Sequence, residues 1–306
     1  MTAGWVASST RGRALLRRTV GSTLARSIAE SDAWPPARTV LSNTAVGSDM
    51  PATADRAAAR RAATVATAWQ LRVLAGWLPP ASSGMVRAFA APLEIANIES
   101  QLEQVTHGTS ASSIPLGTLG VAWPSVRRAR TADELRTLLA RSAWGDPGGV
   151  DRTTVALGLR VAWARRLARQ TRLAAAWAHG GAALLAARER LAFDRGIAEP
   201  TSRELDRLLG TGWRRASTPA EFAERLPTVA WVFDEVTTTD DLWRGEVAIV
   251  RRVAEDARRV ADGARNGRDT IVSVMALLLV DLWQVHAAIE AAGRTPIVTE
   301  VFDAVA

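Results

Sequence analysis

Apolar residues recur along this chain at intervals of three and four positions, which is the spacing of one face of an α-helix. No stretch shows a convincing alternation of apolar and polar residues, as a half-buried strand would. The pattern therefore predicts an all-α protein with short connectors. We expect helices at residues 13–28, 37–44, 57–78, 85–105, 154–171, 173–191, 201–209, 242–264 and 270–292.

Proline, glycine and capping residues mark several of the expected boundaries. Thr201 and Glu204 have the spacing of a capping box at a helix start. The glycine-rich run 145–149 predicts a helix end and a domain boundary, and residues 106–118 read as a linker. Plausible core positions of the helix at 85–105 are Ala88, Phe89, Ile95, Ile98 and Leu102.

One segment of the chain is repeated. Residues 126–144 and 213–231 are identical at 8 of 19 positions without a gap. A Leu-Gly pair stands just upstream of each copy, and each copy closes on Ala-Trp. Repetition of this kind is typical of architectures built from similar stacked units, which make surfaces for partners more often than a single catalytic pocket.

Each copy of the repeat predicts a capped amphipathic helix. Thr131 and Thr218 stand three residues before Glu134 and Glu221, which is the capping-box spacing, and Pro219 suits the first helical turn. The residues expected on the buried faces are Leu135, Leu138, Leu139 and Ala143 in the first copy, and Phe222, Leu226, Val229 and Ala230 in the second. The closing tryptophans would extend these faces as large apolar anchors.

Composition excludes several kinds of chemistry. The chain has 306 residues, 48% of them hydrophobic, and this length suggests about two domains. It lacks cysteine, lysine and tyrosine, so disulfides, thiol nucleophiles, cysteine-ligated metals, Schiff-base lysines and the lysine-containing phosphate-binding loop are all excluded. The 38 basic residues are all arginine, and the net charge is +7. Because these arginines are interspersed with Asp and Glu, we interpret most of them as solvated helix faces.

The chain shows no secretory signal, because no apolar stretch of the required length follows Arg17 and Arg18. The longest apolar run covers 271–280. Asp281, Gln284 and His286 interrupt its continuation before it reaches the ~20 residues of a membrane-spanning helix. We therefore expect a buried helix in a cytoplasmic protein whose membrane contact, if any, is peripheral.

No catalytic, cofactor-binding or metal-binding residue is predicted. The three histidines lack partners at metal-ligand spacing, and we expect solvent-facing or capping roles for them: His107, His179 and His286. The 12 tryptophans are interpreted as core and inter-helix anchors instead of a ligand-stacking system.

An acidic group near the second repeat could suggest a Mg²⁺-dependent helical enzyme such as an isoprenoid synthase. Its members are Asp234, Glu235, Asp240, Asp241 and Glu246. Such an enzyme needs a second acidic set on a facing helix, and the sequence offers none. We interpret residues 239–241 as the acid-rich start of a helix, favoured by the helix dipole.

Taken together, these segments resemble the C/d family of V-type and A-type ATPases, the central-stalk adaptors of these rotary enzymes. The resemblance rests on the arginine-rich start at 11–15, on Leu-Glu-Ile-Ala-Asn-Ile at 93–98, on the two repeats, and on Leu-Trp-Arg-Gly-Glu at 242–246. Residues 33–47 are the candidate for a degenerate third repeat, which lacks the capping Glu. Family members usually end these units with tyrosine, which this chain lacks.

The resemblance implies a funnel-like protein of two to three pseudo-repeated helical units. We assign the units to 1–50, 51–149 and 150–306; the second contains the repeat at 126–144, and the third the repeat at 213–231 with the C-terminal long helices. The implied role is a non-catalytic rotor component without cofactor or small-molecule substrate. It would couple the central shaft to the membrane proteolipid ring on the cytoplasmic face, in proton or sodium transport.

A second interpretation is a helical, arginine-rich protein that associates with nucleic acid or has a regulatory role. It is motivated by the charge of +7 and by basic turns such as Arg127-Arg128 and Arg214-Arg215. It would require a basic stripe on one face and a recognisable reading helix. The sequence shows neither, so no nucleic-acid partner is expected.

Overall fold

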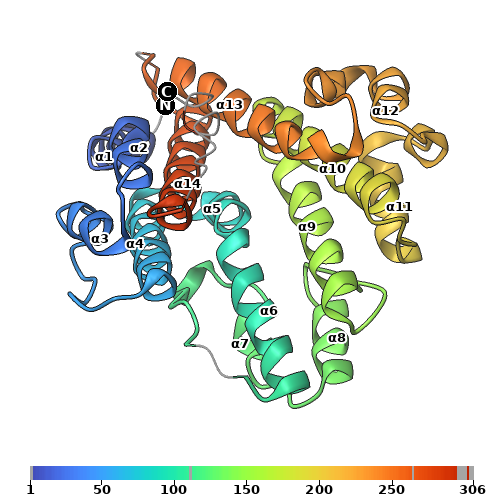
Figure 1. Cartoon of the computed structure of the whole chain (residues 1–306), viewed down its shortest axis with the longest axis horizontal. Helices are drawn as coiled ribbons and strands as arrows, with labels where there is room; N and C mark the ends of the chain where they lie inside the picture. Colours follow the sequence, from blue (N-terminus) through green and yellow to red (C-terminus); the bar gives the residue numbers. More distant parts are fainter. Residues whose placement is uncertain (1–2, 110–111, 264, 295–301, 303–306) are drawn as a thin grey trace. The chain divides into compact units, whose positions relative to one another are not determined.

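Every regular element in the described part of the chain is a helix, which confirms the predicted all-α fold (Figure 1). The structure is a computed structural model that describes residues 3–109, 112–263, 265–294 and 302. The chain divides into two compact units. Unit 1 comprises Met1–Phe89 and Val250–Ala306, and unit 2 comprises Ala90–Ile249.

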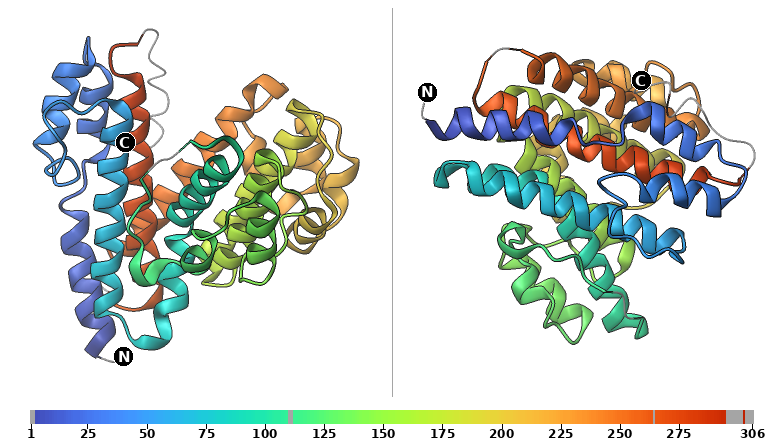
Figure 2. Two further views of the ribbon diagram at one scale, coloured as in Figure 1. Left: turned by 90° about the horizontal axis from the view of Figure 1, so that it is seen from below. Right: turned by 90° about the vertical axis from the view of Figure 1, so that its left-hand side faces the viewer.

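Unit 1 is organised around one long apolar helix. Its helices are α1 (Ala3–Leu16), α2 (Gly21–Ala29), α3 (Trp34–Ser42), α4 (Arg56–Trp77), α5 (Ser83–Phe89), the later part of α13 (Leu242–Ala261) and α14 (Arg268–Ala291). Helix α14 contacts each of the helices α1 to α5, and Figure 2 shows it running beside α1 and α4. Most of its side chains are buried, so helices from both ends of the chain share one core.

Helix α14 is also the one helix among the described residues that is long and apolar enough to cross a membrane. By length and composition, the expectation that Asp281, Gln284 and His286 leave this run too short to span does not hold for the 24-residue helix. In this structure 67% of its most apolar window is buried inside the protein. A core helix explains that burial, as the sequence predicted.

Unit 2 is built around α9. Its helices are α6 (Ala91–His107), α7 (Trp123–Val126), α8 (Ala132–Ala140), α9 (Arg152–Ala168), α10 (Arg172–Ala187), α11 (Glu199–Leu209), α12 (Pro219–Arg225) and the first part of α13. Helix α9 contacts α6, α10 and α11. One apolar cluster in this unit joins α6, α7, α8 and α9.

Both copies of the repeat place the predicted threonine cap at the start of a helix, but the glutamate accepts from the residue before the cap, one position further back than in a full capping box. At the start of α8, Thr131 accepts a hydrogen bond from the backbone N–H of Glu134, and the Glu134 carboxylate accepts one from the N–H of Arg130. At the start of α12, Thr218 and Glu221 make the equivalent pair of bonds, the second from the N–H of Ser217. The two copies therefore share local structure as well as sequence.

The apolar faces of the two copies are buried in part as expected. Leu135 and Leu139 in the first copy match Phe222 and Leu226 in the second, and all four are buried. Ala143, by contrast, is exposed, and Leu138 and Ala230 are only half-buried.

The tryptophans that close the two copies differ. Trp144 is buried, whereas Trp231 is half-buried. The second helix ends early, at Arg225, because Pro227 lacks an N–H and disfavours the helical conformation at the residue before it. The chain continues as the 3₁₀ segment η5 (Pro227–Phe233), so the two copies diverge after the shared leucine.

Two expected helices are each split in the structure. The helix predicted at 13–28 breaks between Leu16 and Gly21, and the one predicted at 85–105 breaks at Ala90, just before Pro92. The five core positions expected around the second break are all buried. At the first break Gly21 adopts a positive φ of 73°, and its N–H bonds to a tertiary acceptor described below, which helical periodicity does not encode.

The boundaries of the compact units differ from the expected division at 1–50, 51–149 and 150–306. The physical reason is the shared core of unit 1, in which α14 packs against α1 to α4. The threefold division and the funnel rest on the repeats and on the family resemblance, and they stay predictions.

The packing of α9 generates a test. A β-carbon added at Gly158 would lie 2.9 Å from the Cα of Pro147, which is backbone and cannot move aside cheaply. Gly181, inside α10, has nothing within 4 Å of the same position. We expect Gly158→Ala to lower the free energy of unfolding by about 1–3 kcal/mol. Gly181→Ala should raise it by about 0.5–1 kcal/mol, because alanine is the better helix former.

Both variants are compared with the parent protein by urea unfolding followed by circular dichroism. Equal shifts in the two variants would contradict the close approach of Pro147 to α9.

Candidate functional site

A buried carboxylate on α6 holds the start of another helix in unit 2. Glu94 is 1% exposed, and its Oε1 accepts hydrogen bonds from the backbone N–H groups of Val121, Ala122 and Trp123 at 2.7–2.8 Å. These N–H groups lie at the beginning of α7, where they have no partner within the helix. The negative charge also suits the positive end of the helix dipole.

One turn further along α6, a buried amide holds the preceding connector. The side chain of Asn97 donates to the carbonyl of Ile114 at 2.9 Å and accepts from the N–H of Ile114 at 2.7 Å. Ile114 is itself buried, so the segment predicted as a linker is held to the core. Glu94 and Asn97, three residues apart, thus fix the path into the first repeat at two points.

Unit 1 contains a related arrangement that the sequence analysis missed. Asp281, buried on α14, accepts from the N–H groups of Gly21 at 2.8 Å and Val20 at 3.2 Å, at the start of α2. Burial raises the pKa of Asp281, while these two bonds oppose the rise. Gln284, three residues later, is also buried.

The order of Asp281 and Gln284 matches Glu94 and Asn97: an acid followed three residues later by an amide on a helix that carries a buried face. That spacing is the signal that could have revealed the second site. Asp281 also explains why α2 starts at Gly21, because it satisfies the first N–H groups there.

We expect these two carboxylates to dominate the stability of the helix starts that they hold. Glu94→Ala leaves three N–H groups without their acceptor and should lower the free energy of unfolding by about 2–4 kcal/mol. Asp281→Ala removes two bonds and should cost less. Glu94→Gln keeps one oxygen and should cost the least.

The three variants are ranked by urea unfolding at pH 7, with hydrogen exchange at residues 20–21 and 121–123 as a local readout. If Glu94→Ala left exchange at 121–123 unchanged, the cap would not be what holds α7.

The three histidines occupy different environments. His107, the last residue of α6, is largely exposed, as expected, and lies 3.7 Å from Glu103. His179 is half-buried, and burial lowers its pKa. For His286 the expectation was wrong. It lies within unit 1, where its Nε2 is 3.1 Å from the Thr64 hydroxyl and 3.2 Å from the Arg60 carbonyl of α4.

The environment of His286 predicts a pH dependence of stability. Burial, with the charge of Arg60, lowers the pKa of His286 to about 4, although Glu290 opposes the shift. Its pKa in the unfolded chain is about 6.5. Below that value the unfolded chain gains a proton that the folded protein refuses, so stability falls as the pH drops from about 6.5 towards 4.

Over that window we expect the parent protein to lose up to about 3 kcal/mol more than His286→Gln does. Urea unfolding of both proteins at pH 7, 6, 5 and 4 measures this difference. Parallel pH profiles for the two proteins would show that His286 is not kept neutral by the fold.

The acidic group near the second repeat acts as a helix start, as predicted, at least for one member. Asp241 accepts from the Thr237 hydroxyl and from both the N–H and the hydroxyl of Thr238, just before α13. These bonds lower its pKa to about 2. In the described part of the chain, no cluster of three or more His, Asp or Glu side chains is placed to hold a metal ion.

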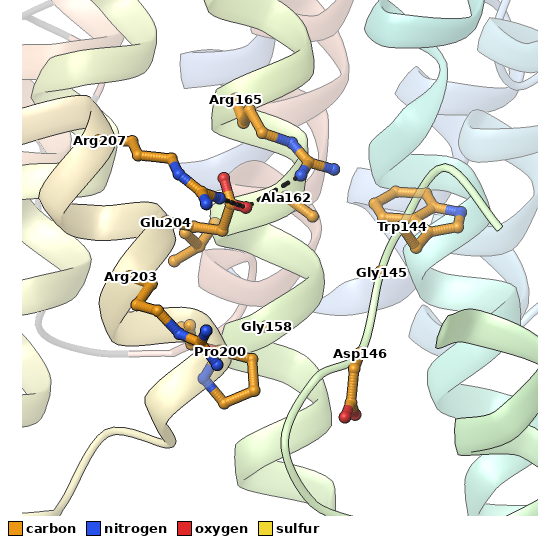
Figure 3. A pocket seen from close by; sticks show the side chains of 12 residues that line it. Trp144, Gly145, Asp146, Gly158, Ala162, Arg165, Pro200, Arg203, Glu204 and Arg207 are labelled. Carbon is orange, nitrogen blue, oxygen red and sulfur yellow. Dashed lines mark hydrogen bonds and ion pairs between the residues drawn. The ribbon is translucent and has the colours of Figure 1, made fainter. Parts of the chain in front are cut away.

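An arginine-lined cavity of about 220 Å³ lies in unit 2, between α9, α11 and the segment that follows α8. Figure 3 shows Trp144 on one side, facing Arg165 and Glu204 on the other. Glu204 accepts from Arg165 at 3.1 Å and pairs with Arg207 as well. The predicted capping box of Thr201 and Glu204 is wrong, because neither residue caps the helix.

The helix in question begins at Glu199, two residues before the expected start, and Ala198 is its N-cap residue. The hydroxyl of Thr201 donates to the carbonyl of Pro147 at 3.3 Å instead of capping the helix. Glu204 is therefore free to serve the two arginines. A single T-x-x-E pattern could not reveal this, because the partner Arg165 lies 39 residues away in the sequence.

No known family model matches this chain, and no characterised protein matches it in sequence. The likeness to the central-stalk adaptors of the rotary ATPases therefore rests on the residues quoted for it and on the internal repetition of the chain.

Proposed function

We propose that this protein is a non-catalytic rotor component of a V-type or A-type ATPase, a member of the central-stalk adaptor family. In that role it joins the central shaft to the proteolipid ring on the cytoplasmic side of the membrane. Its partners are then the shaft proteins and the ring, and its contact with the membrane is peripheral. It needs no cofactor and acts on no small molecule.

The observation that carries this proposal is that helix starts in both units are held by side-chain oxygen atoms in the same way. Two sequence copies form the same threonine cap with a glutamate three residues later, and in each unit a buried carboxylate on a long helix holds the start of another helix. Such fixed helix junctions suit a part that must transmit torque. Densely packed helices pass strain on instead of absorbing it.

The arginines give less support to the nucleic-acid alternative. Arg214, in the basic turn of the second repeat, makes two bonds to the carboxylate of Asp206 at 2.9 and 2.8 Å. Arg136 does the same with Asp146 at 2.8 and 3.0 Å. Arginines committed to carboxylates in this way are poor candidates for phosphate contacts along a nucleic-acid backbone.

Co-purification from the native host tests the proposal. A tagged copy of the chain is captured from solubilised membranes and from the soluble fraction, and its partners are identified by mass spectrometry. We expect shaft proteins together with proteolipids of the ring, in fixed proportion, from the membrane fraction. Recovery of nucleic acid, or of neither set of proteins, would contradict the proposal.

The net charge of +7 predicts that the association with the ring weakens as salt rises, because exposed charges are screened. The fraction of ring proteolipid retained is measured across a salt series from about 0.05 to 0.5 M, a range over which the screening length falls several-fold. Retention that does not change with salt would remove the role of arginine in the contact but leave the rotor assignment standing.

A further inference from the structure

The cavity beside α9 is lined by more arginines than its carboxylates can neutralise. Three arginines line it, namely Arg165, Arg203 and Arg207, together with two acids, Asp146 and Glu204. Asp146 already accepts from two nitrogens of Arg136, Nε and Nη2. Glu204 is thus the one lining acid available to the three lining arginines.

The guanidinium groups have donors to spare. Each can donate five hydrogen bonds. Arg165 gives one to Glu204 and one to the carbonyl of Ala143, while its Nε is buried without a partner. Arg207 gives one to Glu204. Arg203 lies 3.4 Å from Glu199, and both of those side chains are more than half exposed, so this pair is weak.

The hydrogen bonds of Glu204 are unevenly distributed over its two oxygens. Arg165 and Arg207 converge on the same oxygen of Glu204, Oε1, while Oε2 is buried and has no partner. Because both guanidinium groups share one carboxylate oxygen and neither bonds the other oxygen, each arginine has N–H donors without an acceptor. A second acceptor entering the cavity would serve the unused arginine donors, among them the buried Nε of Arg165.

Size and wall chemistry limit what that acceptor can be. A cavity of about 220 Å³ is smaller than the ~300–1,000 Å³ of sites for drug-sized ligands or cofactors. Arginine prefers planar or tetrahedral oxyanions, which it binds through paired N–H donors. Trp144 supplies a flat wall opposite the charges, as Figure 3 shows.

We propose that this cavity is an oxyanion site for one phosphate or carboxylate group. Arg207 and Arg203, whose side chains are 69% and 61% exposed, swing onto the anion at the mouth, while Arg165 forms the inner wall. Glu204 opposes the anion by its charge and sets the affinity low. The inference does not depend on the rotor assignment.

The test is isothermal titration of the full chain at low ionic strength with three probes: inorganic phosphate, acetate, and a short peptide of glutamates. We expect saturable one-site binding that Arg207→Gln and Arg203→Gln each weaken, by up to about tenfold. Glu204→Gln should strengthen binding several-fold, because it removes the one carboxylate that competes with the anion.

The matched control is Arg127→Gln. It makes the same change of net charge at an exposed arginine of unit 2 outside the cavity, and it should leave the affinity within about twofold of the parent protein. The probes separate the sources. Peptide that competes with phosphate for the site indicates an acidic segment of a partner, and phosphate alone indicates a free or esterified phosphate.

No saturable binding of any probe would overturn the proposal. So would binding that Arg127→Gln weakens as much as Arg207→Gln and Arg203→Gln do, because the effect would then be one of total charge. Since both mouth arginines are exposed, their loss should leave thermal unfolding unchanged, and this is checked on each variant. Tighter binding in Glu204→Gln is the outcome that a merely structural role for the cavity would not produce.

Discussion

The structure depends on buried carboxylates that accept hydrogen bonds from the first N–H groups of other helices. A helix start hidden from water is unfavourable unless those N–H groups find acceptors. Glu94 supplies them for α7 and Asp281 supplies them for α2, each from a long helix that belongs to the same core. Because each bond is specific in direction as well as distance, the two helices of each pair can meet in only one way.

This mechanism explains what could and could not be predicted from the sequence. Helix content, the core positions around 85–105 and the threonine caps of both repeats follow from periodicity and from local spacing, and the structure confirms them. The partner of the break between Leu16 and Gly21 does not follow from local spacing, because Asp281, which accepts from the N–H of Gly21, is 260 positions away. A helix start held by a side chain from a distant helix can be predicted from one sequence only when its spacing, here an acid followed three residues later by an amide, is already known.

The candidate cavity shows the same limit more severely. Local spacing predicts Thr201 as the partner of Glu204. Its actual partners are an arginine on another helix and one on its own helix. Charged side chains at such positions are fixed by the packing of α9 against α11 and against the segment at Pro147, which approaches α9 closely where Gly158 has no side chain.

The discontinuity of unit 1 has a consequence for how the chain is made. Helices α1 to α5 are synthesised before α14, the helix around which they pack. Unit 2, whose residues are contiguous, can fold while synthesis continues. Until α14 is synthesised, the faces of α1 to α5 that pack against it stay uncovered. A chain that stops before α14 lacks the helix against which α1 to α5 bury these faces, so unit 1 cannot complete its core without it.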